Sequence, residues 1–532
     1  MLTSLTNKKN KIFSIADAML LIKDGDTIVT SGFTGTGSPE TLFRGLARRF
    51  KETGFPRNLT YTFPAAPGDG NQRGVNSIAL EGLVKRVIFG HIGMIPALQK
   101  LIVENKAEGY NLPLGVIAQL YRDIAAGKPG TLTSVGLGTF ADPDFGGGKM
   151  NASSTDDLVK KIDIEGQQYL LYKCFPLNIA LVRGTTADPD GNVSLEHEAL
   201  NHGLRAIAAA VHNSGGKVIV QVKKIVENGM LTGRQIHLPA CLVDAVVISE
   251  ERGDDAQTYL DYFNPTFCGD MRVPMNEIPM MPLTERKVIA RRGAMELSTD
   301  ALVNLGIGIP EGVASVAAEE GLSKTFTLTT EAGVIGGVPC GGLNFGVSYN
   351  PEAFFAIGDQ FDLYDGGGID AAFLGLAQVD EEGNINVSKF GTKIPGFGGF
   401  INISQNSKKV VFMGTFTAGG LEVKIDDGKL TIVKEGKARK FVRNLEQRTF
   451  NGKLAAKKNA NVLYVTERCV FKLTIDGLEL IEVAPGIDIE RDIIANMDFR
   501  PIIKNPRPMD ERIFMNQPMG LKADELYQNA FA

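Results

Sequence analysis

Apolar stretches of strand length alternate with amphipathic helical patterns along the chain. Strand-like runs occupy residues 26–32, 58–63, 217–226 and 408–414, and a helical pattern occupies residues 39–50 between the first two runs. Runs that are apolar at consecutive positions are typical of parallel strands buried on both faces. The alternation predicts an α/β fold with largely parallel sheets flanked by helices, and it excludes an all-α or all-β chain.

Two motifs occur twice, in the same order. Residues 35–40 (GTGSPE) and 306–311 (GIGIPE) both read G-x-G-x-P-E, and each follows a strand-like run. Further on, residues 188–192 (DPDGN) and 380–384 (DEEGN) both read D-x-x-G-N, as a turn between two strands does. The repeat predicts two similarly folded lobes, the first of which carries an insertion.

The stretch between the two repeats has the composition of a linker. Residues 264–287 contain four prolines and show no clean periodicity. A chain of 532 residues is also too long for one hydrophobic core. We therefore place the first lobe at residues 1–262, a linker at 263–287 and the second lobe at 288–532.

Composition and charge narrow the class of protein. The chain is 43% hydrophobic and 22% charged, with a net charge of -5, so we expect a soluble enzyme or binding protein with no nucleic-acid partner. No apolar run reaches the ~18 residues of a membrane span, and residues 1–14 lack the apolar core of a signal peptide. These features predict a cytoplasmic protein without a membrane partner.

Cysteine and histidine usage argues against a metal centre. The five cysteines are far apart and show no metal-binding spacing. The five histidines all lie in the first half of the chain, which excludes a histidine triad or zinc site within the second lobe, and we expect surface or turn positions for them. They are His91, His197, His202, His212 and His237.

Glu331 is the first candidate for chemistry. It follows the β-rich run 326–330 and precedes residues 332–342, which are rich in glycine and other small residues. The strand would fix the carboxylate, and the small residues would leave room for a bulky acyl compound. A charged residue at a loop edge would fit the same pattern.

The glycine clusters are candidates for anion binding. G-x-G-x-P-E at a strand-to-helix turn leaves backbone N–H groups free to bind a phosphate or carboxylate, although close helix–strand packing would also explain it. A later cluster, residues 396–400 (GFGGF), could aim N–H groups into a site as an oxyanion hole requires, or could form a bulge at a strand entry. The candidate anion-binding residues of the repeated motif are Gly35, Gly37, Gly306 and Gly308.

Several long motifs together resemble the family I coenzyme A transferases, in their single-chain, two-lobed form. The resemblance covers nearly the whole chain and is closest to the acetate and propionate CoA-transferase branch, which is similar to the 3-ketoacid CoA-transferases. The motifs that carry it include GFTGTGSPE, VGLGTFADPDFGGGKMN, NLGIGIPEGVA, TTEAGVIGG, DLYDGGGIDAAFLGLAQVDEEGNINV and VTERCVFKL.

The resemblance implies a mechanism. Glu331 would attack an acyl-CoA thioester, and a glutamyl-CoA thioester would carry CoA to a second acid in a ping-pong exchange. Gly398 or Gly399 would donate an N–H to the oxyanion. Acyl-CoA and short-chain carboxylic acids would be the partners, CoA would be a substrate rather than a cofactor, and the enzyme would be a homo-oligomer, a dimer or tetramer.

One position departs from the family pattern. Many relatives carry a glutamine between Pro and Gly that helps to hold the oxyanion, and this chain has Leu114 there. Either the donor is absent, or Gln119 or a backbone group takes its place, or the acyl pocket is more apolar than in relatives.

Two rival functions fit parts of the sequence. An acyl-CoA hydrolase of the same fold would use Glu331 in the same way and pass the intermediate to water. A sugar-phosphate isomerase or ligand sensor would use the glycine motifs at the helix N-termini but would leave Glu331 unexplained.

Overall fold

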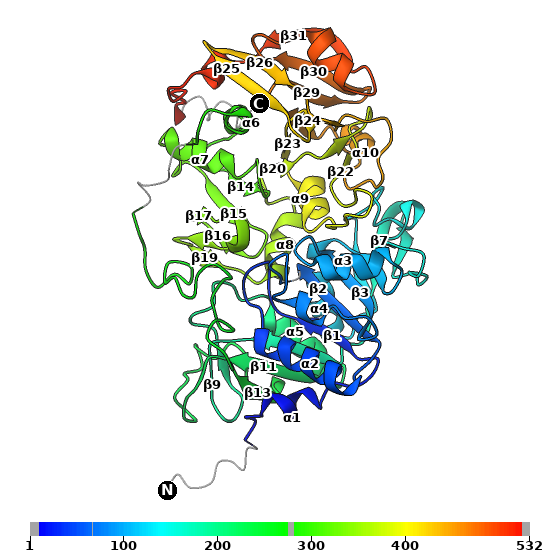
Figure 1. Cartoon of the computed structure of the whole chain (residues 1–532), viewed down its shortest axis with the longest axis vertical. Coiled ribbons are helices and arrows are strands. Elements are labelled where there is room, and N and C mark those ends of the chain that lie inside the picture. The colour runs from blue at the N-terminus through cyan, green and yellow to red at the C-terminus, as the bar shows by residue number, and fades with distance from the viewer. Residues whose placement is uncertain (1–9, 66, 275–280, 524–532) are drawn as a thin grey trace.

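The computed structural model describes residues 10–65, 67–274 and 281–523. Two lobes, each built on one large sheet, are stacked along the long axis of the molecule (Figure 1). Residues 1–9, which were considered for a signal peptide, and residues 275–280 of the predicted linker lie outside the described residues. The exact lobe boundaries therefore stay a prediction.

The first lobe contains a seven-stranded sheet in which every neighbouring pair is parallel. The interior strand β8 is buried at all five positions, as its four consecutive apolar residues before Arg183 favour. In sheet order, the strands are β13 (Ala245–Ile248), β11 (Lys217–Val222), β8 (Ile179–Arg183), β1 (Thr27–Thr30), β2 (Leu59–Ala65), β3 (Val84–His91) and β4 (Glu108–Asn111).

The second lobe contains a ten-stranded sheet. Its strands β15, β14, β20, β23 and β28 are parallel and follow the same order as β2, β1, β8, β11 and β13 of the first lobe. This match confirms the predicted α/β fold with two similar lobes. In sheet order, the strands are β19 (Ala353–Phe354), β16 (Val334–Ile335), β15 (Thr327–Thr330), β14 (Leu302–Leu305), β20 (Ala371–Gly375), β23 (Lys409–Met413), β28 (Asn461–Val465), β29 (Cys469–Thr474), β30 (Gly477–Val483) and β31 (Ile502–Pro508).

Helices cover both faces of each sheet. Helices α1 to α3 share a core with one face of the first sheet, and α6 and α7 do so for the second. Between the sheets, α4, α5, α8 and α9 pack into one continuous core that joins the lobes. The helices are α1 (Ile15–Met19), α2 (Glu40–Thr53), α3 (Pro96–Val103), α4 (Leu114–Ala125), α5 (Leu204–Asn213), α6 (Glu285–Ala294), α7 (Gly312–Glu319), α8 (Ile357–Asp365), α9 (Phe400–Asn406) and α10 (Gly452–Lys457).

Smaller sheets surround these layers, and β5 to β7 form the insertion of the first lobe. They comprise β10 (Val193–Ser194), β9 (Thr186–Ala187) and β12 (Lys224–Ile225); β5 (Gly130–Thr133), β7 (Gln167–Lys173) and β6 (Val159–Ile164); β17 (Val338–Pro339) with β18 (Ser348–Tyr349); β21 (Gln378–Val379) with β22 (Ile385–Asn386); β24 (Thr417–Ala418) with β27 (Ala438–Arg439); and β25 (Glu422–Asp426) with β26 (Lys429–Lys434).

The two D-x-x-G-N motifs form matching turns. Each turn joins two short antiparallel strands, β9 to β10 and β21 to β22. In the first, the side-chain amide of Asn192 donates to Asp188 at 2.8 Å; in the second, that of Asn384 donates to Asp380 at 2.8 Å. The predicted turns between strands are therefore confirmed in both lobes.

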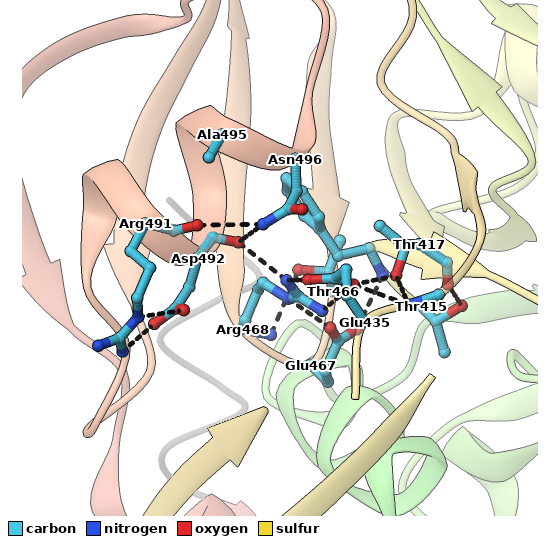
Figure 2. A network of polar contacts seen from close by, with 12 residues as sticks. Thr415, Thr417, Glu435, Thr466, Glu467, Arg468, Arg491, Asp492, Ala495 and Asn496 are labelled. Atoms are coloured by element: carbon cyan, nitrogen blue, oxygen red, sulfur yellow. Dashed lines mark hydrogen bonds and ion pairs between the residues drawn. The ribbon is translucent and has the colours of Figure 1, made fainter. Parts of the chain in front are cut away.

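The tail motif VTERCVFKL builds a buried ionic cluster at the end of β28 (Figure 2). The fully buried guanidinium of Arg468 pairs with Glu467 at 2.7 Å and with Glu435 at 2.7 Å, and it also donates to the Asp492 carbonyl. Glu467 in turn accepts the Phe416 N–H at 2.8 Å. A buried charge is tolerated only when it is paired in this way, so the motif holds the loops after β23 and β28 together.

Candidate active site

A cavity of about 200 Å³ opens where the two lobes meet. Its walls come from the carboxyl ends of strands in both sheets and from the loop before α9, the place where ligands bind in parallel α/β sheets. The lining residues are Phe33, Thr34, Ala65, His91, Asn304, Leu305, Gly306, Ile307, Glu331, Phe345, Leu374, Gly375, Val387, Pro395, Gly396, Phe397, Gly398, Gly399, Phe400 and Ile403.

Glu331 faces this cavity from the end of β15. The strand is anchored just before it, because the hydroxyl of Thr330 donates to the Gly346 carbonyl at 2.8 Å. The N–H of Gly333 then closes a turn on the Thr330 carbonyl at 3.1 Å. The backbone around the carboxylate is held on both sides, so the side chain projects from a fixed point.

Burial raises the pKa of Glu331 to about 7, and a hydrogen bond from the backbone N–H of Gly399 lowers it in part. Removal from water disfavours the charged form of a carboxyl group, which is the larger effect here. Near neutral pH the group exists in both forms. A perturbed carboxyl in a cleft has the properties of a functional group.

Gly399 lets the carboxylate come close. A Cβ atom at this position would lie 2.1 Å from Oε2 of Glu331 and 2.9 Å from the ring of Phe361. Gly399 is also the residue that precedes the first turn of α9, so its N–H is not needed inside the helix. The second predicted donor differs, because the N–H of Gly398 donates to the Gly90 carbonyl at 2.8 Å.

The small residues after Glu331 do not make room for a ligand, which corrects the steric expectation from the sequence. None of residues 332–343 lines the cavity. Cβ atoms at Gly333 and Gly337 would meet the Phe355 and Tyr349 carbonyls at 2.3 and 2.1 Å. These glycines allow tight backbone packing around β16 and β17, and the room beside Glu331 comes from the loop 395–399 instead.

The four glycines predicted to bind an anion differ in their surroundings. Gly306 lines the cavity, and Gly308 has open space around it. Gly35 and Gly37 lie against protein, since Cβ atoms there would meet the Leu343 carbonyl at 1.8 Å and the His202 ring at 1.9 Å.

Gln119 lies on the interface between the lobes rather than in the cavity wall. Its amide donates to Asp362 and Asp365 of α8, at 3.1 Å each. Leu114 is fully buried at the start of α4, and its backbone N–H donates to the Gly398 carbonyl at 2.9 Å. Neither side chain lines the cavity.

His91 and the aromatic walls were missed by the sequence analysis. The expectation of surface or turn histidines is wrong for His91, which lines the cavity at the end of β3, whereas His202 lies in a turn but is buried. The position of His91 directly after a parallel strand was the available signal. Phe33 and Phe345, from different lobes, stack with ring centroids 6.1 Å apart and close one side.

This arrangement suits covalent chemistry at a carboxylate. Apolar walls exclude water, and a carboxylate needs no separate base in order to act as a nucleophile. Within the described residues, no group of three or more His, Cys, Asp or Glu side chains is placed to hold a metal ion. Across the same part of the chain, none of the helices has the length and apolar character of a membrane span.

Comparison with known proteins places the chain in a family. Residues 12–249 match the coenzyme A transferase family model. The chain is 49% identical to caffeate CoA-transferase of Acetobacterium woodii, covering 96% of this chain and 98% of the relative. It is 42% identical to the acetate CoA-transferase YdiF of Escherichia coli K12, covering 98% of each.

A solved structure agrees over the same length. The thioester complex with CoA of the acyl-CoA transferase YdiF from Escherichia coli O157:H7 superposes with a TM-score of 0.91 at 41% identity, covering 97% of this chain and 98% of that one. The chain therefore belongs to the coenzyme A transferase family, as an enzyme that moves CoA between an acyl-CoA thioester and a free carboxylic acid.

Proposed function

We propose that Glu331 carries CoA during the transfer, in a ping-pong reaction. The carboxylate attacks the thioester carbonyl carbon of acyl-CoA, the C–S bond breaks, and an acyl-glutamyl anhydride and CoA thiolate form. The thiolate then attacks the glutamyl carbonyl and releases the first acid as a carboxylate. A second carboxylate reverses these steps and leaves as a new acyl-CoA.

One observation carries this proposal. The Glu331 carboxylate lies in an interlobe cavity with the N–H of Gly399 directed at it. One thioester is exchanged for another, so the covalent route divides the transfer into steps of similar energy without ATP. We accordingly propose no cofactor, with CoA as a substrate.

We propose short-chain carboxylic acids as the exchanged groups, with acetate as one acceptor. The names of the relatives include both acetate and caffeate, and a cavity of about 200 Å³ with aromatic walls does not limit the acyl group to acetyl. Apolar pockets discriminate one methylene by only about 1 to 3 kcal/mol, so several short chains should react.

The test is chemical trapping of the intermediate. Incubation with propionyl-CoA and no acceptor, followed by borohydride, should modify one glutamate, and peptide mass spectrometry should place it at Glu331. Glu331→Gln should abolish exchange and labelling, and Glu331→Asp should lose on the order of a hundredfold because its carboxylate is displaced by one methylene. Labelling of another carboxylate, or near-normal exchange by Glu331→Gln, would remove the proposal.

The same assay separates transfer from hydrolysis. A transferase should release little free CoA from propionyl-CoA with or without acetate and should form acetyl-CoA once acetate is added, and double-reciprocal plots should be parallel. Steady release of free CoA at the same rate with and without acetate would identify a hydrolase. Intersecting plots would identify a ternary complex and contradict the covalent route.

We also propose that the enzyme is a cytoplasmic homo-oligomer, a dimer or tetramer. The support is the family resemblance together with the ordinary soluble composition. Light scattering on the purified protein would measure its mass directly, and a monomer of 57.3 kDa would contradict the oligomer.

A further inference from the structure

His91 is fixed relative to the loop that faces Glu331. The carbonyl of its neighbour Gly90 accepts the Gly398 N–H at 2.8 Å, and the N–H of its other neighbour Ile92 donates to the Pro395 carbonyl at 2.8 Å. These two bonds cross between the lobes on either side of His91. The backbone at His91 is therefore held beside the loop 395–399, and its side chain lines the cavity there.

The imidazole itself has no protein partner. Neither ring nitrogen of His91 makes a hydrogen bond to any of the described residues, and the ring rests on Gly93, where a Cβ atom would lie 2.7 Å from Cε1 and Nε2. Burial lowers the pKa of His91 to about 4, so the ring is neutral wherever Glu331 is ionised. A neutral imidazole offers one N–H donor and one lone pair. The half-buried ring of His91 lines the cavity without a protein partner, so it is free to bind a ligand there.

The other side-chain hydrogen-bond donors that line the cavity already donate to protein groups. The amide of Asn304 donates to the Thr329 carbonyl at 3.4 Å and to the Tyr364 hydroxyl at 3.1 Å. The hydroxyl of Thr34 donates to the Phe345 carbonyl at 2.9 Å. Among the lining side chains that the structure describes, His91 is thus the N–H donor that remains available.

The backbone N–H groups of the loop 395–399 and of Phe400 also donate to groups within the protein. The N–H groups of Phe397 and Gly398 donate to Asn111 and Gly90, and that of Phe400 donates to Phe397. Gly399 directs its N–H at Glu331. The side chain of Leu114, at the position where the family resemblance implies a glutamine donor, is apolar and does not line the cavity. Among the described lining side chains, the imidazole of His91 is the N–H donor left for a developing negative charge.

We propose that His91 supplies this donor as a catalytic residue, and that its neutral imidazole N–H binds the oxyanion formed when Glu331 attacks the thioester. As the new C–O bond forms, the carbonyl π pair moves onto oxygen, and the N–H of His91 stabilises it. No proton is transferred. When the pair returns, the C–S bond breaks and its electrons leave with the CoA thiolate. This inference rests on the proposed function and adds a residue from the other lobe to it.

The experiment compares variants that keep or remove the donor. His91→Gln retains an N–H donor, whereas His91→Leu has similar bulk and none. With propionyl-CoA and acetate, His91→Leu should lower kcat by about 100- to 1,000-fold with little change in the KM for propionyl-CoA, as loss of one oxyanion donor does. His91→Gln should stay within about tenfold of the wild type. His212→Leu, an exposed histidine of α5, is the matched control and should leave kcat unchanged.

A second readout isolates the chemical step. Rapid mixing with propionyl-CoA alone should show slower release of propionate, the acid that leaves as the glutamyl-CoA thioester forms, in His91→Leu by the same factor as kcat. Thermal unfolding checks that each variant is folded, and His91→Ala, which also lacks the donor, replaces His91→Leu if the latter is unstable.

The outcomes are separable from those of the proposed function. Wild-type kinetics in His91→Leu would overturn the inference, and so would equal losses in His91→Gln and His91→Leu, which indicate a packing role. Borohydride labelling of wild-type Glu331 is independent of His91, so its absence would count against the glutamyl intermediate and not against the donor alone.

Discussion

Glu331 combines two properties that oppose each other. For the proposed attack on a thioester its carboxylate must be ionised, yet the apolar surroundings that would protect the proposed intermediate from water disfavour the ionised form. The contact with the Gly399 N–H offsets only part of that cost, and the pKa settles at about 7. The reactive form is consequently lost as the pH falls through 7, well above the range of an ordinary glutamate.

The first prediction concerns this ionisation. The value of kcat/KM for propionyl-CoA should rise about tenfold between pH 6 and pH 8 and then level off, because that is the change in the carboxylate fraction for a pKa near 7. The measurement is a pH profile of initial rates at low substrate. A flat profile from pH 5.5 to pH 8 would show that Glu331 is already ionised in the free enzyme. His91→Gln should show the same pH dependence of kcat/KM, because this substitution leaves the ionisation of Glu331 unchanged.

At the scale of elements, α9 and the loop before it shape the site. The glycines of residues 396–399 let the chain turn sharply, with φ of +82° at Gly396 and +53° at Gly398, and deliver Gly399 to the carboxylate. The glycines after Glu331 serve β16 and β17 instead. Identical residues thus have different roles according to the element that packs against them.

The second prediction follows from this packing. Gly399→Ala should lower kcat by at least about 100-fold, because its Cβ would occupy space 2.1 Å from Oε2 of Glu331 and displace the carboxylate. Gly375→Ala is the control, since this glycine lines the same cavity and a Cβ there meets nothing within 4 Å. The measurement is kcat for both variants, and thermal unfolding checks that each of them is folded. Equal activity of the two variants would show that the contact is unimportant.

At the scale of the whole molecule, the active site exists only because two lobes meet. Helix α4 of the first lobe packs on α8 of the second, where Arg122 pairs with Asp362 at 2.6 Å and a Cβ at Gly115 would meet Phe361 at 2.3 Å. The buried side chain of Asn111 adds a bridge at the site itself. Its amide donates to the Gly90 carbonyl at 2.8 Å, and its oxygen accepts the Phe397 N–H at 3.1 Å.

The third prediction tests that bridge. Asn111→Ala should destabilise the protein by about 1 to 3 kcal/mol, since it leaves the Phe397 N–H unpaired, and should also lower kcat more than tenfold by releasing the loop 395–399. Asn192→Ala removes a comparable set of hydrogen bonds within the first lobe, to Asp188 and the Ala240 N–H, and should lower stability only. Denaturant unfolding and kcat are measured for each. Parallel losses of both quantities in the two variants would contradict a specific role for the bridge.

Local patterns in the sequence determined much of this protein. Consecutive apolar positions predicted the buried parallel strands, the repeated G-x-G-x-P-E and D-x-x-G-N motifs predicted two similar lobes, and the carboxylate after a strand singled out Glu331. Each of these inferences depends on residues that are neighbours in the chain, where strand burial and turn chemistry act directly.

Tertiary structure alone decided how the site is assembled. Glu331 and Gly399 are far apart in sequence and meet through the fold of the second lobe, and His91 reaches the same cavity only because the first lobe packs on the second. A glycine has no side chain whose size or polarity would predict its environment. The sequence therefore could not show that the loop 395–399, and not the run 332–342, forms the cavity wall beside Glu331. His91 likewise became a candidate only when the fold buried it without a partner beside the proposed nucleophile, because the environment of a titratable group is set by distant residues that surround it in three dimensions.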